Sequence, residues 1–333
     1  MNLNDVEKKF LSILYKLKSQ IKEIERFDSY KYCKDILTNE KIMRRYFNYL
    51  VHYTSYVKLK GKVIIDAGCG SGIFSVLLSL LSAEKVYAVD YIADCIEMTK
   101  FVVSIADLNN IEVIHSDIGE LNQAEKSVDG IFCIEAISHI RDYKSFLDIA
   151  SRVCKERGFL VIIDSNNGAS PIIRRKNFKI WDIFENYSGQ TAIFGHQKSD
   201  NCYLDMRAEI IGKNFPNLSQ SEVREFAKYT FGYSKSEIIK AVSQFIKRDF
   251  SLKSEYSEGK CPLDPEFDCY MENLFNPIEL KRELLNYGFK SLIKSNGTYR
   301  KGLRILNYFW ELLSPLTIFL PKGFTLIAIK QRE

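Results

Sequence analysis

The first 60 residues alternate apolar and polar positions with the period of an α-helix. Leu3, Phe10, Leu17 and Ile24 recur every seven residues, and no Gly or Pro interrupts residues 1–60. Such spacing gathers apolar side chains on one face of a helix. We therefore expect one amphipathic helix over residues 3–26 that packs on the rest of the chain. A coiled-coil dimer is less favoured, because the pattern lasts only about three heptads.

From residue 61 the pattern changes to short apolar runs, rich in β-branched residues, that alternate with helical periods. Strands are predicted at 62–67, 85–90, 111–115, 128–134 and 158–163, and helices at 72–82, 92–107 and 142–155. This alternation is typical of a parallel sheet with crossover helices. We expect a doubly wound α/β core over residues 61–165, preceded by an N-terminal helical segment over 1–60.

All seven prolines lie beyond residue 170, where the composition changes again. Residues 166–278 are predicted to be a helical insertion, with helices near 171–187, 202–214, 219–230 and 234–248. Residues 279–333 then return to the core. Their strands at 289–295 and 324–330 complete a mostly parallel, seven-stranded sheet with the insertion between its fifth and sixth strands. An apolar segment, 303–320, is expected to be a buried helix; contact with a membrane surface is the less favoured alternative.

Composition and charge narrow the class of protein. The eight cysteines are scattered without a CxxC pair, which predicts reduced, mostly buried thiols rather than a zinc site or disulfides. No secretory leader and no run of about 18 apolar residues is apparent, so a cytoplasmic protein is expected. A net charge of +5 is mild for 333 residues and does not by itself imply nucleic acid, which is not expected as a partner.

The segment 66–72 (DAGCGSG) follows a predicted strand and begins a helix. Its glycines let the backbone pass close to a ligand, and helix N-terminal amides point into the same space, which indicates a bound nucleoside. Ile73 occupies the position where the dinucleotide fingerprint requires its third glycine. Asp66 would also repel a pyrophosphate and attract a cationic ligand, so NAD is disfavoured.

With this motif, residues 61–164 resemble, in order, the class I S-adenosylmethionine-dependent methyltransferases, which have a Rossmann-like fold. The resemblance implies S-adenosylmethionine as cofactor and S-adenosylhomocysteine as product. It implies that Asp90 accepts the ribose hydroxyls, that Asp117 reads the adenine amino group and that Ile118 lines the ring. Capping of the next turn is the alternative role for Asp117. The expected cofactor-binding residues are Asp66, Gly68, Cys69, Gly70, Gly72, Asp90, Tyr91, Asp117, Ile118 and Ile134.

Residues 131–140 (IFCIEAISHI) match the family's fourth motif, which faces the methyl group. Glu135 and His139 are four residues apart, so one helical turn would place both on one side. We predict His139 as general base, with Glu135 near the sulfonium or orienting the substrate; a packed or solvent-facing histidine is the alternative. Glu135, Asp164 and Asn166 occupy positions where some methyltransferases bind magnesium, but we expect no metal.

The acceptor is less well defined. The chain lacks the [DNS]-P-P-[YFW] motif of base-amine methyltransferases and the double-glutamate loop of protein arginine methyltransferases. In the segment 171–186, Arg174, Arg175 and Trp181 are candidate binders of an anionic substrate, although a solvated basic face is the more ordinary explanation. The segments 164–186, 214–238 and 272–289 resemble a bacterial subgroup linked to glycan and natural-product modification.

We therefore predict O-methylation of a small molecule or saccharide. N-methylation, and a catalytically silent cofactor-binding subunit that acts through a partner, are the alternatives. A homodimer is left open.

Overall fold

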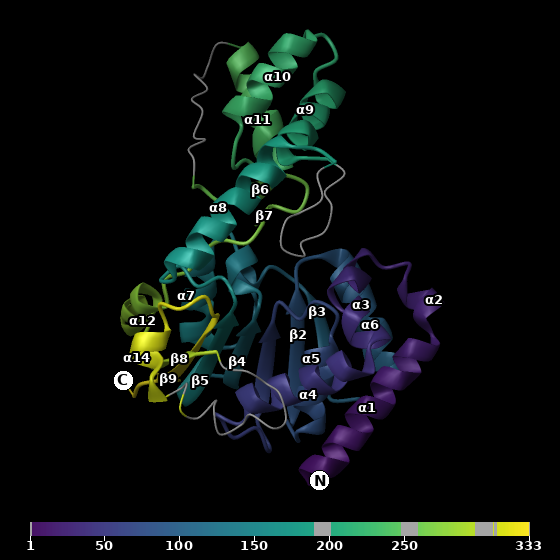
Figure 1. The fold of residues 1–333 in the computed structure, drawn as a ribbon, viewed down its shortest axis with the longest axis vertical. Coiled ribbons are helices and arrows are strands. Elements are labelled where there is room, and N and C mark those ends of the chain that lie inside the picture. The colour runs from purple at the N-terminus through teal and green to yellow at the C-terminus, as the bar shows by residue number, and fades with distance from the viewer. Residues whose placement is uncertain (1, 190–200, 248–258, 297–308, 310–311, 333) are drawn as a thin grey trace. The chain divides into compact units, whose positions relative to one another are not determined.

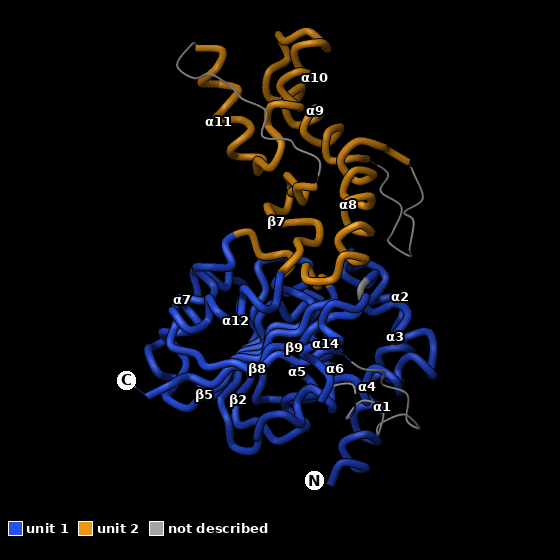
Figure 2. The backbone as a smooth tube through the Cα atoms, turned by 60° about the vertical axis from the view of Figure 1, so that its left-hand side comes forward, with its two compact units in different colours: residues 1–137, 142–165, 276–333 blue, residues 138–141, 166–275 orange. Residues whose placement is uncertain are grey.

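The computed structural model describes residues 2–189, 201–247, 259–296, 309 and 312–332. The chain divides into two compact units (Figure 2). Unit 1 comprises Met1–Ile137, Asp142–Ser165 and Asn276–Glu333, and unit 2 comprises Ser138–Arg141 and Asn166–Phe275. The short segment 138–141 therefore belongs to unit 2, although it lies within the sequence range predicted for the core.

Unit 1 contains the seven-stranded sheet, in the order β3-β2-β1-β4-β5-β9-β8 (Figure 1). Its strands are β1 (Val63–Ala67), β2 (Lys85–Asp90), β3 (Ile111–His115), β4 (Val128–Ile134), β5 (Cys154–Asp164), β8 (Phe289–Ser295) and β9 (Phe324–Lys330). β9 pairs antiparallel with both β5 and β8, and the other pairs are parallel. The predicted fold class is confirmed: a mostly parallel Rossmann-like sheet whose order reverses between β1 and β4.

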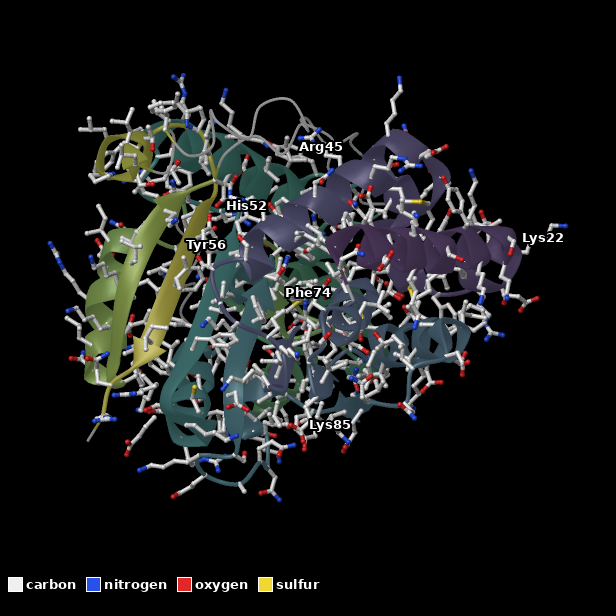
Figure 3. The ribbon with its side chains drawn as sticks, turned by 90° about the horizontal axis from the view of Figure 1, so that it is seen from below. Lys22, Arg45, His52, Tyr56, Phe74 and Lys85 are labelled. Atoms are coloured by element: carbon white, nitrogen blue, oxygen red, sulfur yellow. The ribbon has the colours of Figure 1, made fainter. Side chains whose placement is uncertain are left out.

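Close packing of the central strands fixes the middle of the sheet. The ring of Phe132 on β4 lies 5.3 Å from that of Phe74 and 5.5 Å from that of Phe159, both edge to face. Phe74 lies among the central side chains of the unit in Figure 3. A Cβ at Gly130 would come within 2.2 Å of the Phe159 ring, so only glycine fits at that point of β4.

Helices pack around the sheet of unit 1. They are α1 (Leu3–Ser19), α2 (Ile21–Ile24), α3 (Lys34–Thr38), α4 (Glu40–Thr54), α5 (Ile73–Leu80), α6 (Ala93–Ala106), α7 (Tyr143–Val153), α12 (Pro277–Asn286) and the short α14 (Ser314–Thr317), with 3-10 turns at Asp28–Tyr32 and Ile118–Glu120. A further 3-10 turn, Ile137–His139, begins at the last residue of this part of unit 1 and continues into the segment 138–141 of unit 2. Phe10 and Leu14 of α1 share one buried cluster with Leu77 of α5. The prediction that the first helix packs on the main body is confirmed.

The first helix is shorter than predicted. A single helix over 3–26 was expected, but α1 ends at Ser19 and Gln20 leaves helical geometry at φ −109° and ψ 28° before α2 begins. The apolar period continues across the break, because Ile24 is buried in the same cluster as Leu17. Periodicity therefore identified the buried face and did not reveal the interruption.

Unit 2 contains the helical insertion. Its elements are α8 (Pro171–Asn186), α9 (Tyr203–Asn214), α10 (Gln220–Tyr229), α11 (Lys235–Ile246) and a small hairpin of β6 (Leu263–Asp264) and β7 (Cys269–Tyr270), which the sequence did not predict. Ser219 and Ser234 begin α10 and α11 with complete capping boxes. Arg207 is 1% exposed and makes a two-pronged ion pair with Glu185, while its Nε donates to the Ala227 carbonyl. This buried pair joins α8, α9 and α10 inside the unit.

The expectation for the apolar segment 303–320 is corrected where the structure describes it. Residues 303–308, 310 and 311 lie outside the described part, but Leu312 is 65% exposed and Leu316 is 72% exposed, so the predicted burial is wrong at these positions. In the parts of the chain that the structure describes, no helix combines the length and apolar character that crossing a bilayer requires.

Burial of the cysteines agrees with the sequence prediction. Seven of the eight thiols are buried, and Cys269 in the hairpin of unit 2 is partly exposed. Desolvation raises the pKa of the Cys33, Cys154 and Cys261 thiols to about 12.

Candidate functional site

The glycine-rich turn joins β1 to α5 in unit 1. Gly68, Gly70 and Gly72 all have positive φ, at +74°, +53° and +74°. Their surroundings differ: a Cβ at Gly68 would come within 2.6 Å of the Ala136 Cβ, and one at Gly72 within 2.7 Å of Thr99, whereas one at Gly70 meets nothing within 4 Å. The turn is therefore packed against protein at its two ends and open at its centre, where a ligand can approach the backbone.

Two hydroxyl residues that the sequence analysis missed stabilise this turn from inside. The hydroxyl of buried Thr99, on α6, donates to the Gly70 carbonyl at 2.9 Å. Ser75 on α5 donates to Asp66, which is only 2% exposed. Burial raises the pKa of Asp66 to about 7, against the opposing effect of the Ser75 hydrogen bond. Asp66 therefore lies in the interior as an anchor between β1 and α5, behind the turn rather than on its open side.

Asp90, at the end of β2, contacts the same turn. Its Oδ2 accepts from the Gly70 amide at 2.9 Å and its Oδ1 from the Ile92 amide at 3.0 Å. Burial raises the pKa of Asp90, which is 8% exposed, while these backbone amides oppose the shift. Each carboxylate oxygen has a second lone pair, so Asp90 can accept further hydrogen bonds from a pair of adjacent hydroxyls.

Asp117 follows β3 and is solvent-exposed. Its Oδ1 accepts from the Gly119 amide at 2.7 Å, so it caps the 3-10 turn that begins at Ile118. The capping alternative is therefore realised in this structure, and adenine recognition by the same carboxylate stays a prediction. Ile118 is buried and Tyr91 and Ile134 are half-buried, while Cys69 is buried with its Sγ 3.6 Å from the Thr99 hydroxyl.

Glu135 lies directly after β4 and beside the glycine turn, because its neighbour Ala136 packs against Gly68. Its backbone adopts the left-handed region at φ +50°. Oε2 accepts from the amide of Ser165 at 2.9 Å and from its hydroxyl at 2.7 Å, and Oε1 accepts from the Tyr49 hydroxyl at 3.1 Å. Three donors thus hold the Glu135 carboxylate next to the open turn, and the backbone of the same residue is strained. Strained residues of this kind are typical of functional sites.

The pKa of Glu135 is raised, to about 7. The first cause is desolvation by the surrounding protein, and the second is repulsion from the buried Asp164 carboxylate; the Ser165 and Tyr49 hydrogen bonds oppose both. The side chain still reaches solvent, so it is accessible to a ligand. Tyr49 and Ser165 were not predicted. Ser165 could have been found from the sequence, because it directly follows the predicted fifth strand. Tyr49 could not, because it is 86 positions from Glu135 and no sequence pattern links the two residues.

Comparison with known proteins settles the class. Residues 58–228, more than half of the 333-residue chain, match the model of a family described as a methyltransferase domain. The chain belongs to this methyltransferase family. The donor is S-adenosylmethionine, and the open centre of the turn at Gly70 together with the hydrogen-bonding capacity of Asp90 fits its nucleoside part.

Individual relatives of this methyltransferase match over part of their length. It is 35% identical over 104 residues to "Ubiquinone biosynthesis O-methyltransferase, mitochondrial" of Schizosaccharomyces pombe, covering 31% of this chain and 37% of that protein. It is 25% identical over 118 residues to demethylmenaquinone methyltransferase of Staphylococcus aureus, covering 35% and 48%. The chain thus spans less than half the length of these curated relatives. A solved S-adenosylmethionine-dependent methyltransferase from Aquifex aeolicus aligns at 15% identity and a TM-score of 0.41, over 94% of this chain and 97% of that one.

His139 of the methyltransferase lies in unit 2, whereas Glu135 lies in unit 1. The expectation that one helical turn carries both Glu135 and His139 is wrong. The backbone of Glu135 has a positive φ, outside helical geometry, and the 3-10 turn that contains His139 begins only at Ile137. The Nδ1 of His139 lies 2.9 Å from the Tyr270 carbonyl oxygen. Because a carbonyl only accepts, Nδ1 carries a proton, and in the neutral form of the ring Nε2 is then the nitrogen that can accept one. This is the tautomer that a general base requires.

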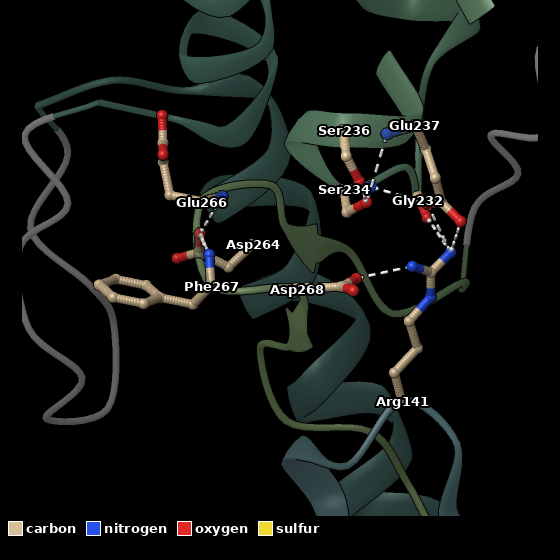
Figure 4. Close-up of polar contacts among 9 residues, drawn as sticks. All are labelled: Arg141, Gly232, Ser234, Ser236, Glu237, Asp264, Glu266, Phe267 and Asp268. Atoms are coloured by element: carbon tan, nitrogen blue, oxygen red, sulfur yellow. Dashed lines mark hydrogen bonds and ion pairs between the residues drawn. The ribbon is translucent and has the colours of Figure 1, made fainter. Parts of the chain in front are cut away.

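Arg141 fixes the segment that carries His139. Its guanidinium pairs with Asp268 at 2.6 Å and with Glu237 at 2.8 Å, and also donates to the Gly232 carbonyl (Figure 4). The same Glu237 completes the capping box of α11. Residues 138–141 are therefore held by α11 and by the loop between β6 and β7, which explains why this segment belongs to unit 2. The sequence analysis did not single out Arg141.

The predicted substrate residues of α8 differ in their surroundings. Arg174 and Arg175 are exposed, so both guanidinium groups are accessible to solvent. Trp181 is 4% exposed and donates its indole N–H to the Glu272 carbonyl at 3.2 Å. Trp181 thus packs inside unit 2, while the two arginines lie on its surface.

The residues considered as magnesium ligands have other partners. Asp164 is fully buried, Glu135 is held by Tyr49 and Ser165, and the Oδ1 of Asn166 accepts from Asn177 at 2.9 Å. Among the described residues, no group of three or more His, Cys, Asp or Glu side chains is arranged to hold a metal ion.

A pair of glycine replacements tests the open turn. Gly70→Ala and Gly61→Ala both place a Cβ at positive φ in open space, so each should lower the free energy of unfolding by about 1–2 kcal/mol. Only Gly70→Ala should also weaken S-adenosylhomocysteine binding, by about tenfold or more. Urea unfolding and titration calorimetry measure the two effects. A ligand site at Gly70 would be contradicted if both variants lost S-adenosylhomocysteine affinity equally, or if neither variant lost any.

Proposed function

We propose that this methyltransferase transfers a methyl group to a hydroxyl oxygen of a small molecule or saccharide. The observation that carries the proposal is Glu135, an accessible carboxylate held beside the cofactor turn with its pKa raised to about 7. A hydroxyl acceptor needs an oriented hydrogen-bond partner and a base, whereas a carbon or thiolate nucleophile does not need both. Similarity over 104 residues to an enzyme named as an O-methyltransferase supports oxygen over nitrogen.

Bound S-adenosylmethionine supplies an electrophilic methyl group on a sulfonium. In the proposed reaction the acceptor oxygen forms a bond to that methyl carbon as the carbon–sulfur bond breaks, which releases S-adenosylhomocysteine. Glu135 accepts a hydrogen bond from the substrate and orients it in line, and the Nε2 of His139, four residues further along the chain, takes the hydroxyl proton. Arg174 and Arg175 are proposed to bind an anionic group of the substrate.

An acceptor screen tests the proposed function. The protein is incubated with S-adenosylmethionine and a panel of hydroxylated and aminated small molecules and saccharides, and mass spectrometry records methylated products. We expect oxygen-methylated products with stoichiometric S-adenosylhomocysteine. Methylation confined to amines would assign the N-methyl alternative, and tight cofactor binding with no product across the panel would favour a silent subunit.

Replacing Glu135 with Gln removes the charge and keeps the size of the side chain. Because the pKa of Glu135 is raised to about 7, the group is protonated as pH falls below 7, so the wild-type rate should decline there. Glu135→Gln should lower kcat about tenfold to a hundredfold and remove the part of this decline that protonation of Glu135 causes, with S-adenosylhomocysteine affinity preserved. Glu125→Gln, at an exposed carboxylate, is the control. A pH profile that is identical in wild type and Glu135→Gln would contradict the assignment.

A further inference from the structure

The C-terminal part of unit 1 contains a helical segment whose large apolar side chains face solvent. The amide of Leu313 donates to the Phe309 carbonyl at 3.0 Å, that of Thr317 to Leu313 at 2.9 Å and that of Ile318 to Ser314 at 3.0 Å. Five residues at helical spacing in this segment are exposed by between 41% and 72% of their surface, and together we name them the apolar stripe: Leu312, Leu313, Leu316, Phe319 and Leu320.

The face of this segment that packs on the protein is mostly polar, because Ile318 (3% exposed) is the one apolar residue among its three buried side chains in the described part. Ser314 and Thr317 are 4% and 6% exposed. The amide of Ser295, at the end of β8, donates to the Ser314 hydroxyl at 2.9 Å, and the Ser295 hydroxyl donates to the Thr317 carbonyl at 3.3 Å. A surface helix of a soluble protein has the opposite polarity, with its apolar side against the core. Rotation of the segment to bury the apolar stripe would break these buried hydrogen bonds, so β8 holds the stripe outward.

Positive charge accompanies the apolar stripe along the sequence. The ten residues before Phe309 contain Arg300, Lys301 and Arg304 and no acid, and Lys322 follows the stripe; Glu311 is the single acid over 300–322. A short apolar face combined with Lys and Arg is typical of segments that lie in the interface of a bilayer with anionic lipids. A two-fold contact between two copies of the chain would instead bring the same patch, and its like charges, together.

We propose that the apolar stripe inserts into the interfacial region of an anionic lipid bilayer and attaches unit 1 to the membrane surface. The segment lies in the plane of the interface, with Leu312 and Leu316 entering the acyl boundary and Lys322 at the headgroups. This attachment does not depend on the proposed methyl transfer, because it uses no residue of the cofactor turn and none of the predicted catalytic residues.

Co-sedimentation with vesicles tests the proposal on the full chain. The vesicles are phosphatidylcholine alone and phosphatidylcholine with phosphatidylglycerol. Wild type should bind the anionic vesicles, and less so as salt is raised. The double variant Leu312→Gln/Leu316→Gln should bind at least about tenfold more weakly. The matched control, Leu285→Gln/Ile246→Gln, replaces two exposed apolar residues outside the stripe (61% and 49% exposed) and should bind like wild type.

Thermal unfolding and S-adenosylhomocysteine affinity verify that each variant is folded. Because the two replaced leucines, Leu312 and Leu316, are exposed, we expect neither property to change; if the double variant fails to fold, the single variant Leu316→Gln provides the same comparison. Absence of wild-type binding to anionic vesicles, or equal binding by the stripe and control variants, would overturn the proposal. A dimer in sedimentation velocity that the stripe variant abolishes, without vesicle binding, would assign the stripe to a second copy of the chain.

Discussion

Replacing Asp90 with Ala should weaken S-adenosylhomocysteine binding by about a hundredfold to a thousandfold, equivalent to about 3–4 kcal/mol. The carboxylate accepts from the amides of Gly70 and Ile92, so its removal leaves two backbone donors without their partner and also removes the proposed acceptor of the ribose hydroxyls. Titration calorimetry measures the affinity, and turnover should fall in parallel at low cofactor concentration.

Two further variants separate cofactor contact from damage to the turn. Asp90→Asn keeps one carbonyl oxygen and the size of the side chain, and should lose about tenfold in affinity with a smaller loss of stability. Asp107→Asn, at an exposed position with φ +52° that asparagine tolerates, should bind like wild type. A folded Asp90→Ala protein whose affinity stays within about twofold of wild type would contradict the assignment.

Replacing His139 with Ala should lower kcat about a hundredfold or more, with S-adenosylhomocysteine affinity unchanged. The Tyr270 carbonyl keeps the proton of the ring on Nδ1, so the unprotonated Nε2 is the only base that the side chain can offer. Kinetics with an acceptor from the screen measure the change. Added imidazole should restore part of the rate, a readout that a purely structural histidine would not give.

His52 provides the matched control for this experiment. It lies in α4 of unit 1, next to Tyr56 (Figure 3), and its Nε2 lies 2.8 Å from the Tyr56 hydroxyl. His52→Ala should leave kcat within about twofold of wild type. Near-wild-type turnover in His139→Ala, or a large loss without imidazole rescue, would remove His139 from the proposed mechanism.

The sheet of unit 1 and most helix bounds followed from sequence because burial and periodicity coincide there. Val63–Ala67 and Phe324–Lys330 are apolar runs in strands that are largely buried, and Asp142, where the sequence predicts a helix to begin, caps α7. The hairpin of β6 and β7 was missed because two-residue strands contain too little pattern to detect. The break at Gln20 was missed because the apolar period runs through it.

The site was predictable in its backbone motif and less so in its contacts. The amide of Gly70 donates to Asp90, and this contact was predictable because both residues lie at the carboxyl ends of neighbouring parallel strands. In contrast, the Tyr49–Glu135 contact depends on how α4 packs, and the positive φ of Glu135 depends on its surroundings. The sequence analysis predicted that the apolar stripe is buried, because large apolar residues usually are. In the structure, hydrogen bonds from Ser295 hold the polar face of the segment against the protein instead.

The distribution of thiols makes the methyltransferase suited to site-specific chemistry. Seven cysteines are inside the protein, and desolvation keeps thiols such as Cys33 and Cys154 protonated at neutral pH, which suppresses their reaction with alkylating reagents. Cys269 is the partly exposed exception, at the hairpin whose loop contains Asp268 and whose Tyr270 carbonyl orients His139. A maleimide dye or spin probe would therefore attach to the native chain at Cys269, which directly adjoins both Asp268 and Tyr270 in the sequence, without any cysteine having to be removed first.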